Sequence, residues 1–113
     1  MSKASELLDR VLYRMGERNI FPYYVNGYHD ENKRFTENGN KIINVSETFR
    51  MNGVGHGMEN VTVTINVYRA EREAIYGNKP CALYPVLKVK VPKDASDRVI
   101  DNRIAKVEVA ING

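Results

Sequence analysis

Two segments of alternating apolar and polar residues between Lys41 and Ala70 constrain the fold of this 113-residue chain more than any other feature. Apolar residues occupy one face of each segment, interrupted only by Glu47; they are Ile43, Val45, Phe49, Val61, Val63, Ile65 and Val67. A period of two is typical of a strand with one buried face. The pair of segments therefore predicts an amphipathic hairpin in a sheet that is covered on one side.

A helix is predicted before this hairpin, starting at a cap formed by Ser2 or Ser5 and ending at Gly16. Its apolar residues recur at helical spacing and form one stripe; they are Leu7, Leu8, Val11, Leu12 and Met15. We expect this stripe to pack on the buried face of the sheet. The charged residues of the opposite side are expected in solvent; they are Glu6, Asp9, Arg10 and Arg14.

Two short segments with turn signals lie between this helix and the central hairpin. Ile20 to Val25 is rich in aromatic residues but contains Pro22, which cannot donate to a strand ladder, so an edge strand is predicted. Asn26-Gly27 follows as a turn. Asn38-Gly39 can supply the positive φ angles of a tight hairpin turn and predicts a strand pair within residues 34–43.

The C-terminal part of the chain is predicted to add two strands. Cys81 to Val91 alternates, with Lys88 and Lys90 on one face, and Pro92 ends the segment. From Arg98 onward the apolar residues fit both helical spacing and strand alternation. We predict a turn or short helix from Ser96 to Asn102, followed by a final strand.

Together these elements predict a single α+β domain over residues 1–113, in which an N-terminal amphipathic helix packs on a mostly antiparallel sheet of about five strands. The apolar and charged fractions, 42% and 27%, are typical of globular proteins and not of disordered or membrane chains. Cys81 is the only cysteine, which excludes an internal disulfide and a multi-cysteine zinc site. The sequence lacks an apolar leader and a stretch of membrane-spanning length, so we expect a cytoplasmic protein without membrane contact.

The glycine-rich run between the two central segments is the first candidate binding site. Its expected ligand-binding residues are Arg50, Asn52, Gly53, Gly55, His56 and Gly57. Backbone amides freed by glycine can cradle an anion, and the arginine and histidine can add donors to a phosphate. The run lacks the Lys-Ser/Thr pair of a P-loop and leads into a strand, so a mobile hairpin tip is the simpler interpretation.

The polar face of the predicted sheet is the second candidate. Tyr68 on the hairpin and Tyr84, Lys88 and Lys90 on the later strand combine aromatic rings with a local excess of positive charge. Such a combination suits stacking on bases beside phosphates, and tyrosine is equally common in protein interfaces.

No motif indicates catalysis, a metal or a cofactor. The two histidines, His29 and His56, fall in predicted loops outside any nucleophile signature. The adjacent residues 29–31 cannot all point at one ion, and the later aspartates are interpreted as capping and solvated groups; these are Asp94, Asp97 and Asp101. We therefore expect a non-enzymatic protein that uses no cofactor.

The leading hypothesis from sequence is a small interaction protein. It would engage another protein, or itself as an oligomer, through the open sheet face and the glycine-rich hairpin loop. The alternative is a protein that binds nucleic acid, a nucleotide or another phosphate-bearing ligand, through the glycine-rich loop and the lysine- and tyrosine-bearing sheet face.

Overall fold

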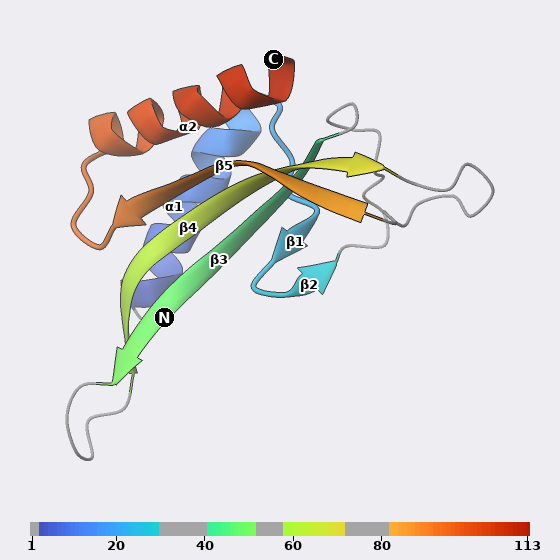
Figure 1. Ribbon diagram of the computed structural model, residues 1–113. Coiled ribbons are helices and arrows are strands. Elements are labelled where there is room, and N and C mark those ends of the chain that lie inside the picture. The colour runs from blue at the N-terminus through green and yellow to red at the C-terminus, as the bar shows by residue number, and fades with distance from the viewer. Residues whose placement is uncertain (1–2, 30–40, 52–57, 72–81) are drawn as a thin grey trace.

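The computed structural model describes residues 3–29, 41–51, 58–71 and 82–113, which form two helices and five strands (Figure 1). In chain order the elements are α1 (Lys3–Glu17), β1 (Tyr24–Val25), β2 (Tyr28–His29), β3 (Lys41–Met51), β4 (Met58–Glu71), β5 (Ala82–Pro92) and α2 (Asp97–Asn112). The strands form one sheet in the order β2-β1-β3-β4-β5. Among the described strand pairs only β1–β3 is parallel, so the predicted α+β fold with a mostly antiparallel sheet is confirmed.

The central hairpin of β3 and β4 follows the alternation of its sequence. Val45 pairs with Ile65 and Ile43 with Val67, and all four side chains are buried on one face of the sheet. Glu47, which interrupts the apolar pattern, lies opposite Val63. Its backbone N–H donates to the Asn26 side chain at 2.8 Å, and its carboxylate accepts from the same amide at 2.9 Å. The interruption therefore ties the hairpin to the β1–β2 turn.

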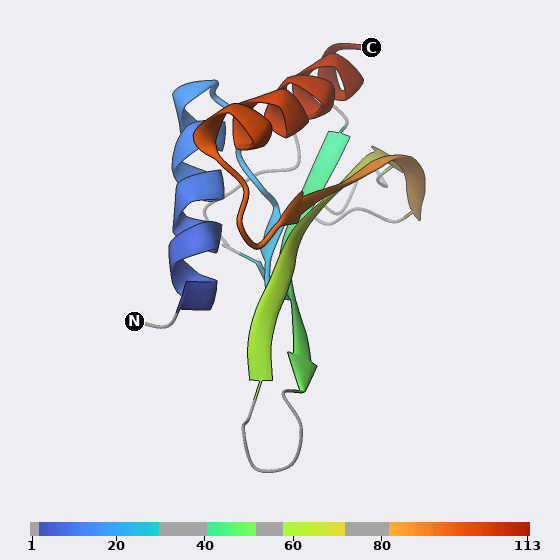
Figure 2. The ribbon, with the colours of Figure 1, turned by 90° about the vertical axis from the view of Figure 1, so that its left-hand side faces the viewer.

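Both helices lie on the same side of the sheet, as Figure 2 shows in profile. The predicted stripe of α1 packs there, with Val11 and Met15 completely buried. On the opposite side of α1, Arg10 is exposed as predicted and Arg14 is partly buried. Both guanidinium groups form ion pairs with the first turns of α2, because the two helices lie close together over the same sheet face.

The C-terminal segment is one continuous helix, so the predicted final strand is wrong. Ser96 caps α2, and its hydroxyl accepts a hydrogen bond from the Val99 N–H at 3.3 Å. Ile100, Ile104 and Val107 are fully buried at helical spacing. Val109, which belongs to the strand alternation, is 72% exposed. The helical period prevails because it alone turns a continuous apolar stripe toward the sheet.

The segment after α1 is shorter in strand than predicted and does not lie at the edge. Only Tyr24–Val25 is a strand, and β2 lies outside it, because β1 pairs in parallel with β3 on its other side. The turn at Asn26-Gly27 is confirmed, with φ angles of 50° and 83° that match the positive values a two-residue hairpin turn requires. The Asn38-Gly39 turn lies outside the described residues.

Candidate functional site

The residues of the predicted sheet-face site lie within the described parts of the chain, whereas most residues of the glycine-rich site do not. Of the glycine-rich site, Arg50 has a defined backbone position in β3, while Asn52, Gly53, Gly55, His56 and Gly57 lie outside the described residues. The sheet-face residues Tyr68, Tyr84, Lys88 and Lys90 are all described. The geometry available for a site is therefore that of the sheet face opposite the helices, which we call the helix-free face.

The pairing of β3, β4 and β5 arranges the polar residues of the helix-free face in rows across the strands. One row holds Asn44, Asn66 and Lys88, and the next holds Ser46, Thr64 and Lys90. Both rows end on β5 with an exposed lysine. Hydroxyl and amide groups thus fill the centre of the face, and positive charge lies along its β5 side.

Negative charge is absent from the described side chains of this face. The polar residues that β3 and β4 direct away from the helices are Asn44, Ser46, Thr48, Thr62, Thr64, Asn66 and Tyr68. Glu47 is on the opposite side, where it bonds to Asn26. The lysines of β5 consequently meet no carboxylate among the described residues of the face, and their field extends over it.

A shallow depression of about 330 Å³ lies beside these lysines. It is lined by Asn66, Tyr68, Pro85, Val86, Leu87 and Lys88. A β-bulge creates it: Leu87 pairs with Val67 and Pro85 with Tyr68, so Val86 has no partner across the ladder. Val86 is 44% exposed, which leaves an apolar wall beside the charged one.

On the β4 side of the depression, Tyr68 packs against a small apolar cluster that is separate from the main core. Tyr23, Ile42 and Ala70 form this cluster, and Tyr24 and Tyr68 pack against it. Tyr23 and Tyr24 meet edge to face with centroids 4.9 Å apart. Burial raises the pKa of the Tyr23 hydroxyl. The cluster supports Tyr68 from behind and leaves part of its side chain in the depression.

The prediction that Tyr84 shares the polar face with Tyr68 and the lysines is wrong. Its partner Arg69 alternates with Tyr68 along β4 and lies on the side of the sheet that carries the helices. Tyr84 pairs across the sheet with Arg69, whose guanidinium carbon lies 4.6 Å from the centre of the tyrosine ring. This cation–π contact occupies one face of the ring. Tyr84 does not line the depression, whereas Asn66, Pro85 and Val86, which the sequence analysis did not select, do.

The outer edge of β5 is partly blocked. The Arg103 side chain of α2 donates from Nε to the Lys90 carbonyl at 3.1 Å, so this carbonyl points away from β4. Backbone direction alternates along a strand, so Lys88 directs its amide and carbonyl the same way. Pro85 has no N–H to offer, and the bulge at Val86 breaks the repeat. A continuous edge for strand addition is therefore not present between Pro85 and Lys90.

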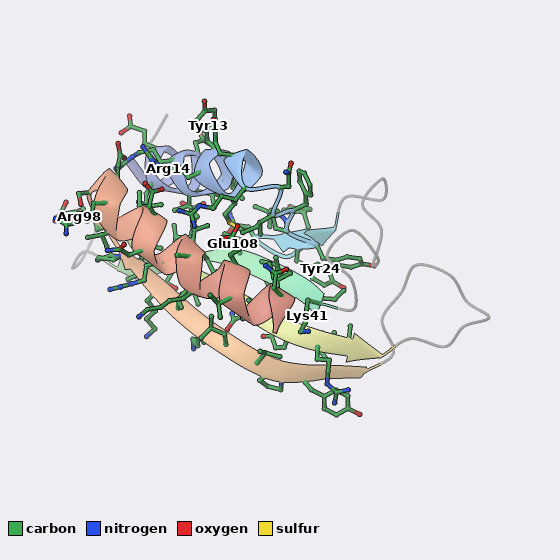
Figure 3. The ribbon with its side chains drawn as sticks, turned by 90° about the horizontal axis from the view of Figure 1, so that it is seen from above. Tyr13, Arg14, Tyr24, Lys41, Arg98 and Glu108 are labelled. Atoms are coloured by element: carbon green, nitrogen blue, oxygen red, sulfur yellow. The ribbon has the colours of Figure 1, made fainter. Side chains whose placement is uncertain are left out.

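A second depression, of about 320 Å³, lies between the helices. Its lining residues are Tyr13, Arg14, Glu17, Arg18 and Asp101. Figure 3 shows Arg14 facing α2 from α1, with Tyr13 turned away from it. Hydrogen bonding to Glu17 raises the pKa of the Tyr13 hydroxyl. Both arginines are already engaged, Arg14 with Asp101 at 2.8 Å and Arg18 with Glu108 at 3.6 Å, so this groove is a structural seam.

The aspartates of α2 belong to the same seam. Asp97 accepts from Arg10 at 2.7 Å and from Arg14 at 2.9 Å, and the hydrogen bond from Arg10 lowers the pKa of its carboxyl. Asp101 accepts two bonds from Arg14. Within the described ranges no three metal-ligating side chains come together, and neither helix is long and apolar enough to cross a membrane.

Comparisons with known proteins add no relative to this geometry. No family model, no curated protein and no solved structure matches the chain.

Proposed function

We propose that this chain is a non-enzymatic interaction protein that engages an anionic macromolecule through the helix-free face of its sheet. The observation that carries the proposal is the asymmetry of charge on that face: exposed Lys88 and Lys90 end two polar rows, and no described side chain of the face is acidic. A partner of opposite charge is favoured at each point of approach, which raises the association rate as well as the specificity.

The edge of β5 argues against assembly of identical copies through that strand. A second β5 strand paired there in antiparallel register around Lys88 would set Lys88 opposite the Lys88 of the second copy, and like charges directly opposite destabilise a sheet. Arg103, Pro85 and the bulge at Val86 remove further pairing positions. The partner is therefore proposed to lie over the face and not to extend the sheet.

The glycine-rich run is retained as a second proposed contact. It connects β3 to β4 in the sequence, and Arg50, at the end of β3, precedes it directly. Arg50 and His56 would add donors for an anionic group.

The test compares two variants with the same net charge. Lys88→Gln with Lys90→Gln removes two charges from the helix-free face, and Arg98→Gln with Lys106→Gln removes two exposed charges from α2. Each change lowers the formal charge from +3 by two, to +1. Figure 3 shows Arg98 projecting outward from the first turn of α2, away from β5.

Binding is measured by fluorescence anisotropy at low salt with two labelled polyanions, polyaspartate and a mixed-sequence single-stranded oligonucleotide. We expect the β5 variant to bind at least one of them roughly tenfold more weakly than the wild type, because it loses two charge contacts. The α2 variant should match the wild type. Equal weakening in both variants would show that net charge alone governs binding and would overturn the proposal. A wild-type protein that binds neither polymer would also overturn it.

A further inference from the structure

We infer that the depression beside Lys88 accepts one nucleotide of a single-stranded nucleic acid that lies over the helix-free face. The inference rests on the proposed function and names the class of its partner. It starts from the lining of the depression, which places an aromatic ring, a side-chain amide and a cation in one space of about 330 Å³. That volume lies at the lower end of the range for small-molecule sites, roughly 300 to 1,000 Å³.

Each wall of the depression matches one part of a nucleotide. Tyr68, Pro85 and Val86 provide apolar surface against which a base can stack. The Asn66 amide both donates and accepts, so it can bond to a base edge whose donors and acceptors are exposed. Lys88 carries the charge that a phosphate requires. The depression thus combines a stacking surface, a hydrogen-bonding amide and a positive charge. These match the base face, the base edge and the phosphate of one nucleotide.

The face continues this pattern beyond the depression. Lys90 lies two residues further along β5, roughly 7 Å away, because a strand rises about 3.4 Å per residue. Such spacing lets the two ammonium groups meet neighbouring phosphates of one strand. The row beside it offers the hydroxyl group of half-buried Ser46, which suits a base or a sugar, whereas Thr64 in the same row is buried.

An acidic polypeptide fits the same surface less well. Extended peptides gain affinity mainly by adding a strand to a free sheet edge, and this edge is interrupted by Pro85, Val86 and the Arg103 hydrogen bond to Lys90. A peptide held by charge alone would leave the Tyr68 ring and the Asn66 amide without a role. A duplex hides its base faces within the stack, so it also leaves Tyr68 unused.

The first experiment locates the ligand. Val86→Glu places a negative charge in the depression, and Val109→Glu places the same charge at a 72% exposed position on α2. With a labelled single-stranded oligonucleotide, we expect the first variant to bind roughly tenfold or more weakly and the second to match the wild type. Both positions are exposed, so both variants should fold. Equal affinities would overturn the inference.

The second experiment tests stacking. Tyr68→Phe keeps the ring and should bind the oligonucleotide within about twofold of the wild type, whereas Tyr68→Leu should bind roughly fivefold or more weakly. Far-ultraviolet circular dichroism and thermal melting check that Tyr68→Leu folds, because Tyr68 packs on the cluster around Ile42. If Tyr68→Leu does not fold, the Val86→Glu comparison decides. Wild-type affinity in folded Tyr68→Leu would overturn the inference.

Competition separates this inference from the proposed function. Unlabelled single-stranded oligonucleotide should displace the labelled one more effectively than a duplex or polyaspartate of equal charge. If polyaspartate binds in a manner that depends on Lys88 and Lys90 while the oligonucleotide does not bind, the nucleic-acid inference fails and the proposed function stands. If neither polymer binds, both fail. Tighter binding of the duplex than of the single strand would also overturn the inference.

Discussion

The same strands build two very different sheet faces. On β4 the residues that face the helices are completely or almost completely buried; they are Val63, Ile65 and Val67. The residues that alternate with them are Thr62, Thr64, Asn66 and Tyr68, and the paired positions on β5 include exposed lysines. One face therefore supplies the apolar burial that stabilises the fold, and the other carries the polar and charged groups through which we propose that a partner is bound.

This contrast predicts where each property is sensitive to substitution. Changes on the helix-covered face should alter the free energy of unfolding and affect binding only through folding. Changes on the helix-free face should alter binding with little effect on stability, provided that they avoid the cluster around Ile42.

Truncation of the central core residue should have the largest effect. Ile65→Ala removes a fully buried side chain from the middle of β4, beneath α1 and α2, and should lower the free energy of unfolding by roughly 2 to 5 kcal/mol. Urea unfolding followed by circular dichroism measures the change. Thr62→Ala on the same strand, at a half-buried position of the opposite face, is the control and should cost less. Similar losses in the two variants would contradict the division between the faces.

Loss of the α2 cap should have the next largest effect. Ser96→Ala removes the hydroxyl that accepts from the Val99 N–H and should destabilise the protein by about 1 kcal/mol. Ser96→Asp, which keeps an acceptor at the helix N-terminus, should retain most of the stability. The same urea titration measures both variants. Equal destabilisation by the two substitutions would show that the cap is not what stabilises this end of α2.

The ion-paired seam between the helices should contribute stability that depends on pH. The folded-state pKa of Asp97 is lowered from its ordinary value of 3.8, chiefly by the Arg10 hydrogen bond, so its contribution is present above that value. It is lost as the pH falls below 3.8 through the folded-state pKa.

Asp97→Asn should therefore be less stable than the wild type at neutral pH, and the difference should shrink toward the acid limit. Thermal melting of both proteins over that pH range measures it. Because the side chains of this seam are partly exposed, we expect the loss to be smaller than that of Ile65→Ala. A difference that stays constant with pH would show that the charge of Asp97, and with it the ion pair, is not the source of the effect.

The helix-covered face was largely predictable from the sequence because its signals are local. Alternation in β3 and β4, the apolar stripe of α1 and the Asn26-Gly27 turn each depend on residues close together in the chain. The structure of the C-terminal segment was not predictable in this way, because Val107 belongs to both the helical and the strand pattern of that segment. The choice depends on packing against the sheet, where Ile100, Ile104 and Val107 are buried together.

The site on the helix-free face was predictable only in part. Alternation selected Tyr68, Lys88 and Lys90, but the depression depends on a bulge, and a bulge depends on which residues pair across β4 and β5. One signal was present in the sequence: Pro85 stands inside a predicted strand, where a proline indicates an edge or a bulge.

The seam between the helices was missed for a related reason. Arg10 and Arg14 lie four residues apart on α1, and Asp97 and Asp101 lie four residues apart on α2. The two pairs have the same spacing and opposite charges, and this match is visible in the sequence. That they face one another follows from the placement of both helices on one sheet face, and the predicted turn or short helix at residues 96–102 carried no information on that placement.

Removal of the face lysines should have the smallest effect on stability. Lys88 and Lys90 are exposed and lie on the strand at the end of the sheet, so Lys88→Gln with Lys90→Gln should change the free energy of unfolding by no more than about 0.5 kcal/mol. Urea unfolding of this variant and of Arg98→Gln with Lys106→Gln should give superimposable curves. A selective loss above 1 kcal/mol in the β5 variant would assign the lysines a structural role and remove the contrast between the two faces. An unchanged free energy of unfolding combined with weaker polyanion binding would instead show that the helix-free face contributes to binding and not to stability, as the contrast between the two faces predicts.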